Sequence, residues 1–529
     1  MLQVKAKPPR RRRAVTIRSR TGCRTCRARH IKCDETPGSC TNCSSTGRVC
    51  DGYDGARLPR TAKGHVAFQI SINLPAMTSD ERRCFTFFTQ HTMPMIVGCF
   101  DSDVWQLIML QMSQAEPAVC HAVAALSALH EGWEKTGMVR LPAVSSQTAH
   151  RRFAFEQYGR AISTLRSRLS SKDPQVRLIA LLCCLLFVFF ELLEENYTNA
   201  LTHLANGMHI LMNQKGRAAR SLMLAQLHQA RNKTPSAEMA LVKTFAHLDV
   251  QSAHFDPSAP VILLYPVDDQ LIDVQYPSLE FHSIADAKDT LDPILNNIFR
   301  FWTTVDTTLR DPSADHQPLY QKHHEINTSL QDHITAFQNF TSTYIPLSVK
   351  ESRSLDIIRL HHVILTINME TILSLSESVY DHFRPMWQEC VDLGEEIVRS
   401  VHAEYGRKLP TLVMDLGINP PLCWVCLKCR DPRLRERALG LLQAWPHMEG
   451  PNSSLGMANM ARATIAVETE SADPLTGLIP EGGRMRNVFI EIPKDRGYAV
   501  LIYTLSDPTK IKPELHWRRF ILDDDMIRY

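Results

Sequence analysis

Six closely spaced cysteines near the start of the chain constrain its fold more than any other feature. They lie in GCRTCRARHIKCDETPGSCTNCSSTGRVC, at Cys23, Cys26, Cys33, Cys40, Cys43 and Cys50. The gaps between them are 2, 6, 6, 2 and 6 residues, so the unit Cys-x2-Cys-x6-Cys occurs twice, joined by a six-residue loop. Disulfides, a metal site and a redox-active thiol pair are the three explanations for thiols at this density.

The N-terminus favours a metal site. It reads MLQVKAKPPRRRRAVTIRSR, with no apolar h-region and no small-residue cleavage site, so we expect no passage through an oxidising lumen. The longest apolar run, Leu178 to Phe190, has 13 residues, which is short of the roughly 20 that span a bilayer. We therefore expect a protein without a membrane span, and we interpret the cysteines as thiolate ligands of zinc.

The number of thiolates predicts the number of metal ions. Each unit supplies three ligands, which cannot complete a tetrahedron around one zinc ion. Two zinc ions have eight ligand positions in all, and six sulfurs fill them if two sulfurs bridge both metals. Six thiolates around two Zn²⁺ ions would leave an excess negative charge, which the neighbouring arginines offset in part. The sequence predicts a cofactor of two zinc ions per cluster.

Basic residues are distributed unequally over the two units. The first carries Arg24, Arg27, Arg29 and Lys32, whereas the second carries only Arg48. The first unit is therefore expected to face a polyanion. A further basic run precedes the cluster at Arg10, Arg11, Arg12 and Arg13, and we interpret it as a nuclear import signal, as an arm that contacts phosphates, or as both.

The spacing, the basic first unit and the trailing CDGY resemble the fungal Zn2Cys6 binuclear cluster transcription factors. The resemblance implies that Cys23 and Cys40 bridge two zinc ions. It implies that Cys26 and Cys33 complete the coordination of one ion, and that Cys43 and Cys50 complete that of the other.

The same resemblance implies that a short helix of the first unit enters the major groove of DNA. Arg29, His30 and Lys32 stand where the family reads the guanines of a CGG-like triplet. Guanine prefers arginine or lysine, so the histidine departs from the pattern and Lys32 is expected to carry more of the readout. Arg24 and Arg27 are candidates for DNA contact too, or they neutralise the cluster and contact phosphates without sequence preference.

Charge separates the head of the chain from the rest. Residues 1–63 hold 16 Lys and Arg against 4 Asp and Glu, whereas the remainder sums to −9, which gives the whole chain its net charge of +3. This split is typical of a nucleic-acid module attached to a regulatory body. The intervening segment has Gly and Pro throughout and no heptad register, so it is interpreted as a linker.

The rest of the chain is predicted to be helical. Apolar residues recur at helical spacing in several windows, among them Phe155, Tyr158, Ile162 and Leu165, or Leu201, Leu204, Met208 and Leu211. The run around Leu178 to Phe190 is apolar on all sides and is expected at the centre of the core. Two β-rich runs around Pro493 to Gly497 predict a hairpin. CCLLFVFFELLEENYTNALTHLANGMHIL also resembles the regulatory region of the same family.

Two further groups of potential ligands have simpler interpretations. Cys423, Cys426 and Cys429 lack a fourth partner nearby and are expected to pack in the core. His361 and His362 are neighbours on a helix and point in different directions, so we expect a surface and a half-buried residue, not a joint metal site.

These observations predict a mainly α protein with four parts: a basic arm (1–22), a Zn2Cys6 DNA-binding cluster (23–50), a linker (51–80) and a helical transcription-regulatory domain with a short C-terminal β-hairpin (81–529). The predicted function is a nuclear, zinc-dependent regulator that binds double-stranded DNA at RNA polymerase II promoters. The resemblance to this family also suggests that the protein controls metabolism or a biosynthetic gene cluster. The helical domain is expected to bind co-regulators, a small effector or a second copy.

An enzyme is not expected, because the chain contains no GxSxG, GxxxxGK[ST], HExxH or GxGxxG motif. The alternative function is a zinc protein with non-specific nucleic-acid or RNA binding.

Overall fold

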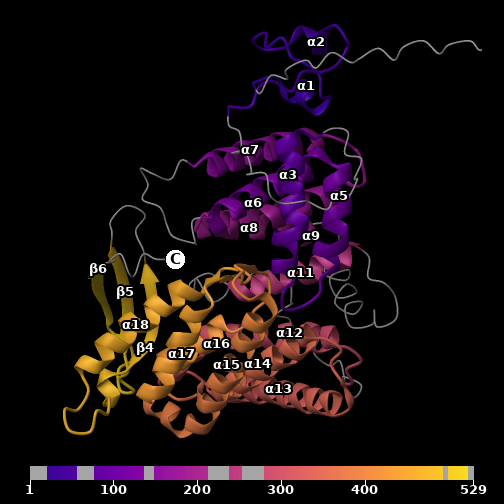
Figure 1. Cartoon of the computed structure of the whole chain (residues 1–529). Coiled ribbons are helices and arrows are strands. Elements are labelled where there is room, and N and C mark those ends of the chain that lie inside the picture. Colours follow the sequence, from indigo (N-terminus) through magenta and orange to yellow (C-terminus); the bar gives the residue numbers. More distant parts are fainter. Residues whose placement is uncertain are drawn as a thin grey trace, which may run out of the picture.

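The computed structural model describes residues 21–55, 77–135, 148–212, 237–252, 279–491 and 498–521. The arginine run at 10–13 and most of the predicted linker lie outside these residues. The protein is mainly α, as predicted, with a small cysteine-rich module set on a large helical body (Figure 1). The cysteine-rich module contains two short helices, α1 (Arg24–Ala28) and α2 (Thr41–Ser44).

The first half of the helical body surrounds α6. This helix begins at Pro117, a position where proline is tolerated because the N–H groups of a first helical turn have no partner within the helix. The elements of this half are α3 (Ser79–Phe87), the π-helical η1 (Phe88–Thr92), α4 (Met93–Ile96), the π-helical η2 (Val104–Ile108), α5 (Met109–Ala115), α6 (Pro117–Lys135), α7 (Ala149–Leu169), α8 (Val176–Leu193), α9 (Tyr197–Met212) and α11 (Ala237–Ser252).

The apolar run at 178–190 forms the centre of α8, and its side chains are buried, as predicted, except for the half-buried Leu178. By length and composition α8 could cross a membrane, but 83% of its apolar window is buried within the protein, as expected for a core helix. In α9, Leu204, Met208 and Leu211 are buried on one face, which confirms the predicted stripe.

The stripe predicted on α7 is only partly confirmed. Tyr158 and Leu165 pack half-buried against the core, but Phe155 and Ile162 are exposed. The helix buries most fully the side of Ala154, Gln157 and Ala161. The reason is that α7 packs mainly along α6, where small side chains and one amide allow a close approach. The ring of Phe155 packs edge-to-face against Phe190 of α8, with the ring centroids 5.3 Å apart.

The second half of the body is a further helical layer beneath the first (Figure 1). Its elements are α12 (Ile284–Arg310), α13 (Gln317–Thr343), α14 (Val349–Thr371), the 3₁₀ helix η3 (Glu377–Phe383), α15 (Arg384–Tyr405), α16 (Asn419–Lys428), α17 (Pro432–Ala444), α18 (Ser454–Glu470) and the 3₁₀ helix η4 (Glu481–Gly483). Cys423, Cys426 and Cys429 are buried in its core, as predicted.

The predicted exposure of His361 and His362 is wrong, because α14 is covered by α12, α13, α15 and α16 and both rings are buried. Their ring nitrogens are nevertheless satisfied. His361 Nε2 lies 3.0 Å from the Gly417 carbonyl oxygen, and His362 Nε2 lies 2.9 Å from His333 Nδ1. The two rings point to different partners, in agreement with the helical spacing.

The two halves meet at a short three-stranded sheet, which the sequence did not predict. Its strands are β1 (Leu412–Val413), β2 (Met448–Glu449) and β3 (Asn452–Ser453). β1 pairs parallel to β2, which pairs antiparallel to β3. Met414 joins the halves directly, since its N–H donates to the Ile96 carbonyl at 3.0 Å and its sulfur accepts the Trp105 indole N–H at 2.9 Å.

The predicted C-terminal hairpin is present and is extended by a third strand. β4 (Met485–Glu491) pairs antiparallel with β5 (Tyr498–Leu505), which pairs antiparallel with β6 (Leu515–Ile521). Leu501 on β5 packs against α18. The sheet is attached to the body by Lys428, whose ammonium donates to the Glu377 carboxylate and to the Arg486 carbonyl.

Candidate zinc cluster and nucleic-acid interface

The two cysteine units fold in the same way. In the first, the Cys23 N–H donates to Cys33 Sγ at 3.3 Å. In the second, the Cys40 N–H donates to Cys50 Sγ at 3.5 Å. In each unit the first cysteine directly precedes a short helix, α1 or α2, and the third lies beyond the end of that helix. The duplication in the sequence is therefore a duplication in the structure.

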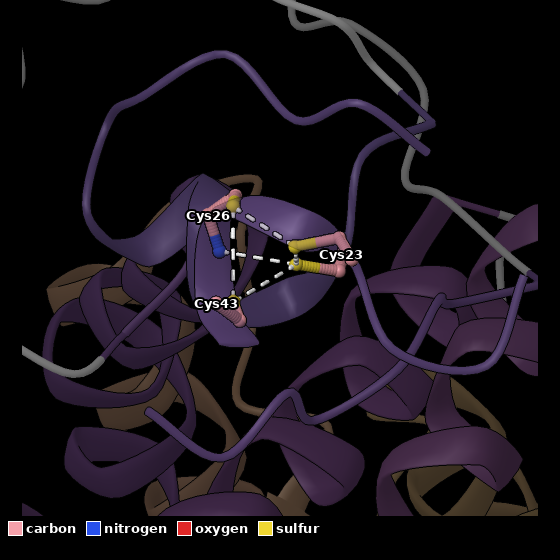
Figure 2. Close-up of side chains that lie close together, drawn as sticks. Cys23, Cys26 and Cys43 are labelled. Carbon is pink, nitrogen blue, oxygen red and sulfur yellow. Dashed lines mark hydrogen bonds between the residues drawn. The ribbon is translucent and has the colours of Figure 1, made fainter. Parts of the chain in front are cut away.

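The sulfur atoms converge where the two units meet. Cys23 Sγ lies 3.5 Å from Cys40 Sγ, and Cys26 Sγ lies 3.5 Å from Cys40 Sγ. Cys43 Sγ is 3.8 Å from Cys23 Sγ, and all four sulfurs lie within 4.8 Å of one another. Figure 2 shows Cys23, Cys26 and Cys43 turned toward one another. These separations are far longer than a disulfide bond of about 2.05 Å, and all six cysteines are free thiols.

The remaining two cysteines lie beside this group. Cys33 Sγ is within 4.8 Å of Cys40 Sγ and of an oxygen of Asp34. The Asp34 carboxylate accepts the N–H groups of Thr41 at 3.0 Å and Asn42 at 3.2 Å, at the start of α2. The carboxylate therefore joins the end of the first unit to the helix of the second.

The electrostatics of the buried sulfurs fit a bound cation. Burial raises the pKa of the Cys23 and Cys40 thiols well above the usual range, because a thiolate removed from water loses its hydration. Burial acts in the same direction on Cys50, but N–H groups of Cys40 and Gly52 outweigh it and lower its pKa to about 7. Divalent metal ions stabilise thiolates in such surroundings, and a set of sulfur donors at this separation suits zinc.

Lys32, His30 and Arg29 lie on the segment that follows α1. Lys32 and His30 are exposed, and Arg29 donates to Thr46 Oγ1 at 3.3 Å. His30 has a positive φ of 56° and its Nε2 lies 3.1 Å from Arg82 Nη2, on α3. Since arginine only donates, His30 Nε2 accepts in this contact.

Arg24 and Arg27 are turned toward carboxylates of the chain itself. Arg24 Nε donates to Glu81 Oε1 at 2.8 Å, and its side chain is only 13% exposed. Arg27 pairs with Asp54, and its side chain is 8% exposed. Asp54 also pairs with Arg160 of α7. Arg24 and Arg27 are therefore largely buried, whereas His30 and Lys32, which follow them, are exposed.

The sequence did not predict the acidic and basic residues that these side chains contact, namely Asp54, Glu81, Arg82 and Arg160. A partial signal exists in CDGYD, where Asp51 and Asp54 directly follow the last cysteine and oppose the basic first unit. Tyr53 of the same motif donates its hydroxyl to the Thr36 carbonyl at 2.6 Å and so closes the loop between the units.

Comparison with known families matches two segments of the chain. Residues 21–59 match the family described as "Fungal Zn(2)-Cys(6) binuclear cluster domain", and residues 83–264 match the "Fungal specific transcription factor domain". The first covers the cysteine-rich module and the second covers much of the first half of the helical body. The cluster domain binds two zinc ions, in agreement with the group of cysteine sulfurs.

Curated relatives point to the same family. "Transcription regulator lscL" of Purpureocillium lilacinum is 30% identical over 238 residues, which cover 41% of this chain and 54% of the relative. "Aspercryptin biosynthesis cluster-specific transcription regulator atnN" of Emericella nidulans is 27% identical over 323 residues, 54% of this chain and 48% of the relative. "Zn(2)-C6 fungal-type transcription factor afumD" of Aspergillus fumigatus is 34% identical over 121 residues, 21% of this chain and 32% of the relative.

The chain spans about half the length of the first two of these relatives. No solved structure matches it significantly. The cysteine units, both domain matches and the names of the relatives agree. The chain therefore contains a fungal Zn(2)-Cys(6) binuclear cluster domain and a fungal specific transcription factor domain, and its relatives are named as fungal transcription regulators.

Proposed function

We propose that this protein is a nuclear, sequence-specific regulator of RNA polymerase II promoters, and that its cluster reads a GC-rich, CGG-like triplet in the major groove. The observation that carries the proposal is the asymmetry of two otherwise equivalent units. Both contribute to the sulfur group, but the first presents Arg29 and the exposed His30 and Lys32 beyond its helix, whereas the second presents a single exposed arginine, Arg48. One unit is suited to contact DNA, and the other completes the metal core.

All six cysteines are the proposed zinc ligands. Cys23 and Cys40 are proposed to bridge the two ions, with Cys26 and Cys33 on one ion and Cys43 and Cys50 on the other. Cys23 Sγ and Cys40 Sγ lie 3.5 Å apart where the two units meet, and each also lies within 3.8 Å of a second sulfur of the other unit, which is compatible with the bridging assignment. The N–H donors to Cys33 and Cys50 support equivalent outer positions in the two units.

Lys32 is the proposed main reader of the triplet, supported by Arg29 and His30. Its ammonium suits the O6 and N7 acceptors of guanine, and the side chain is exposed. Arg10 to Arg13 are proposed to serve in nuclear import or to contact neighbouring phosphates. These contacts would add affinity without adding sequence information.

The helical body is proposed to bind co-regulators, a second copy or a small effector. By analogy with the relative named as specific for a biosynthesis cluster, the target genes are proposed to be a biosynthetic gene cluster.

Selection of bound sites tests the proposal. The full chain, loaded with zinc and assayed for zinc content, is incubated with random duplex DNA, and the bound sequences are recovered. Two zinc ions per chain and an enriched GC-rich triplet are expected, and a Cys26→Ala/Cys43→Ala variant should select nothing. Zinc binding without an enriched sequence, together with equal competition by duplex RNA, would favour the non-specific alternative.

A further inference from the structure

We infer that the helical body holds the zinc module in a closed arrangement, so that docking on the body and binding to DNA exclude each other. The inference rests on the proposed function, because it concerns the same basic residues. Figure 1 shows α1, the helix of the first unit, on the side of the module that faces α3 and α7, whereas α2 lies on the far side. The unit proposed to enter the groove is the one turned toward the body.

The strongest contact joins Arg24 to Glu81. The Glu81 side chain is fully buried, and its Oε1 accepts from Arg24 Nε at 2.8 Å. Its Oε2 accepts the Thr78 N–H at 2.8 Å, and the Glu81 N–H donates to Thr78 Oγ1 at 3.3 Å, so the same residue forms the capping box of α3. A buried carboxylate needs a cationic partner, and here the cysteine-rich module supplies it.

A second contact is bridged by Asp54. This carboxylate is only 2% exposed and pairs both with Arg27 of α1 and with Arg160 of α7. Arg160 also reaches the Asp51 carbonyl oxygen at 3.4 Å. The segment after the last cysteine therefore lies between the first unit and α7, and its Asp54 carboxylate pairs with one guanidinium group from each side.

The third contact engages a proposed reader directly. His30 Nε2 accepts from Arg82 Nη2 of α3 at 3.1 Å, and a ring nitrogen that accepts from arginine cannot donate to guanine at the same time. Arg24 and Arg27 are likewise occupied by carboxylates, which have the same charge as phosphate. DNA must therefore replace Glu81 and Asp54 as the partners of these arginines.

The consequence is a two-state regulator. In the closed state the first unit faces the body, and in the open state it faces DNA. The apparent affinity for DNA is the affinity of the open state multiplied by the fraction of chains that are open. Anything that stabilises the closed state reduces this fraction and so weakens binding to DNA. A co-regulator or a second copy that binds the body and loosens α3 or α7 would raise that fraction without contacting DNA itself.

The test is a variant of the full chain that weakens docking and leaves every proposed DNA contact intact. Glu81→Gln removes one negative charge and keeps a residue that can form a capping box, and Arg160→Gln removes one positive charge. The net charge of the double variant equals that of the natural chain, so a change in affinity cannot come from bulk electrostatics. Glu396→Gln/Arg399→Gln, an exposed pair on α15, makes the same charge changes elsewhere and serves as the control.

Two quantities are measured on each chain, namely the Kd for the selected duplex and the hydrogen exchange of the α1 amides. The double variant is expected to bind about ten times more tightly than the natural chain and to exchange faster in α1, with the control unchanged. Arg160→Gln alone, which leaves the cap of α3 untouched, should shift both quantities in the same direction by less.

Equal Kd values for the natural chain and the double variant would overturn the inference, whether or not the exchange of α1 changes, and would leave the proposed function standing. If neither chain selects any DNA sequence, both the proposed function and the inference fall. The two failures are therefore distinguishable, because only the second abolishes binding by the natural chain.

Discussion

His30 and Gly47 occupy equivalent backbone positions in the two cysteine units. Each lies just beyond the short helix of its unit, and each has a positive φ, 56° for His30 and 64° for Gly47. Glycine adopts this left-handed conformation without steric cost, whereas a residue with a Cβ is strained by about 1 kcal/mol. The first unit therefore retains a strained side chain where the second does not.

Replacing His30 by glycine distinguishes the effect of backbone strain on zinc binding from the effect of the His30 ring on DNA binding. The variant should hold zinc at least as well as the natural chain, because the backbone strain is relieved, and should bind the selected duplex more weakly if the ring contacts a base. Chelator competition measures the first effect and a duplex titration the second. His30→Val is the matched comparison, because a β-branched residue at positive φ should lose zinc at a lower chelator concentration. Weaker zinc retention in the glycine variant would contradict this account.

Cys23→Ala and Cys40→Ala should each remove more zinc than Cys50→Ala. A bridging sulfur serves both metals, so its loss opens both sites, whereas the loss of an outer sulfur opens one. Zinc per chain, measured by elemental analysis of the purified full-length variants, gives the answer. Equal loss in all three variants would count against the bridging assignment.

Lys32→Ala should weaken binding to the selected duplex by about 1–3 kcal/mol and relax the preference at one base position. The reason is that the side chain is exposed beyond α1 and is proposed to donate to guanine. Arg48→Ala in the second unit removes the same charge and serves as the control. It should change specific and non-specific binding alike, and similar effects of the two variants would exclude base readout by Lys32.

Replacing Arg10 to Arg13 by alanine should flatten the salt dependence of DNA binding. Each lost phosphate contact lowers the slope of log K against log salt concentration by about 0.9. Replacement of the same four residues by lysine keeps the charge and should keep the slope. If alanine leaves the slope unchanged and the protein fails to enter the nucleus, the run acts in import alone.

Lys428→Met should lower the free energy of unfolding by about 3 kcal/mol, because it removes a cationic partner from buried Glu377. The Lys428 ammonium lies 2.9 and 3.0 Å from the two Glu377 oxygens and 2.7 Å from the Arg486 carbonyl oxygen. Denaturant titration measures the effect, with Lys322→Met on the exposed side of α13 as the control. If the free energy of unfolding falls no more than in the control, Arg430, whose Nη2 lies 3.2 Å from Glu377 Oε2, is a sufficient cationic partner for the buried carboxylate.

Local patterns predicted the cluster and much of the helical body. The spacing of the cysteines is a local property, and so is the apolar character of α8 or the stripe of Leu204 and Met208 on α9. The part of the stripe assigned to Phe155 and Ile162 was wrong because α7 packs through Ala154 and Ala161, and small residues carry little weight in a periodic pattern.

Contacts between distant segments could not be predicted from local sequence patterns. The burial of His361 and His362 follows from the helices around α14, and the third strand β6, which follows the predicted hairpin, pairs with its second strand β5. The pairs Arg24 with Glu81 and Asp54 with Arg160 join segments 57 and 106 residues apart. No local pattern indicates which residue pairs with which, since charged residues are usually solvated.

Glu81 belongs to two folding units at once. One of its oxygens closes the first turn of the regulatory body, and the other holds an arginine of α1, directly beside the metal ligands. A small cysteine-rich module of this kind folds only around its metal, so a chain short of zinc would leave that carboxylate buried without Arg24. The supply of zinc in the cell would then affect the stability of the helical body as well as the affinity for DNA, and the residue that caps the body's first helix would report on metal status.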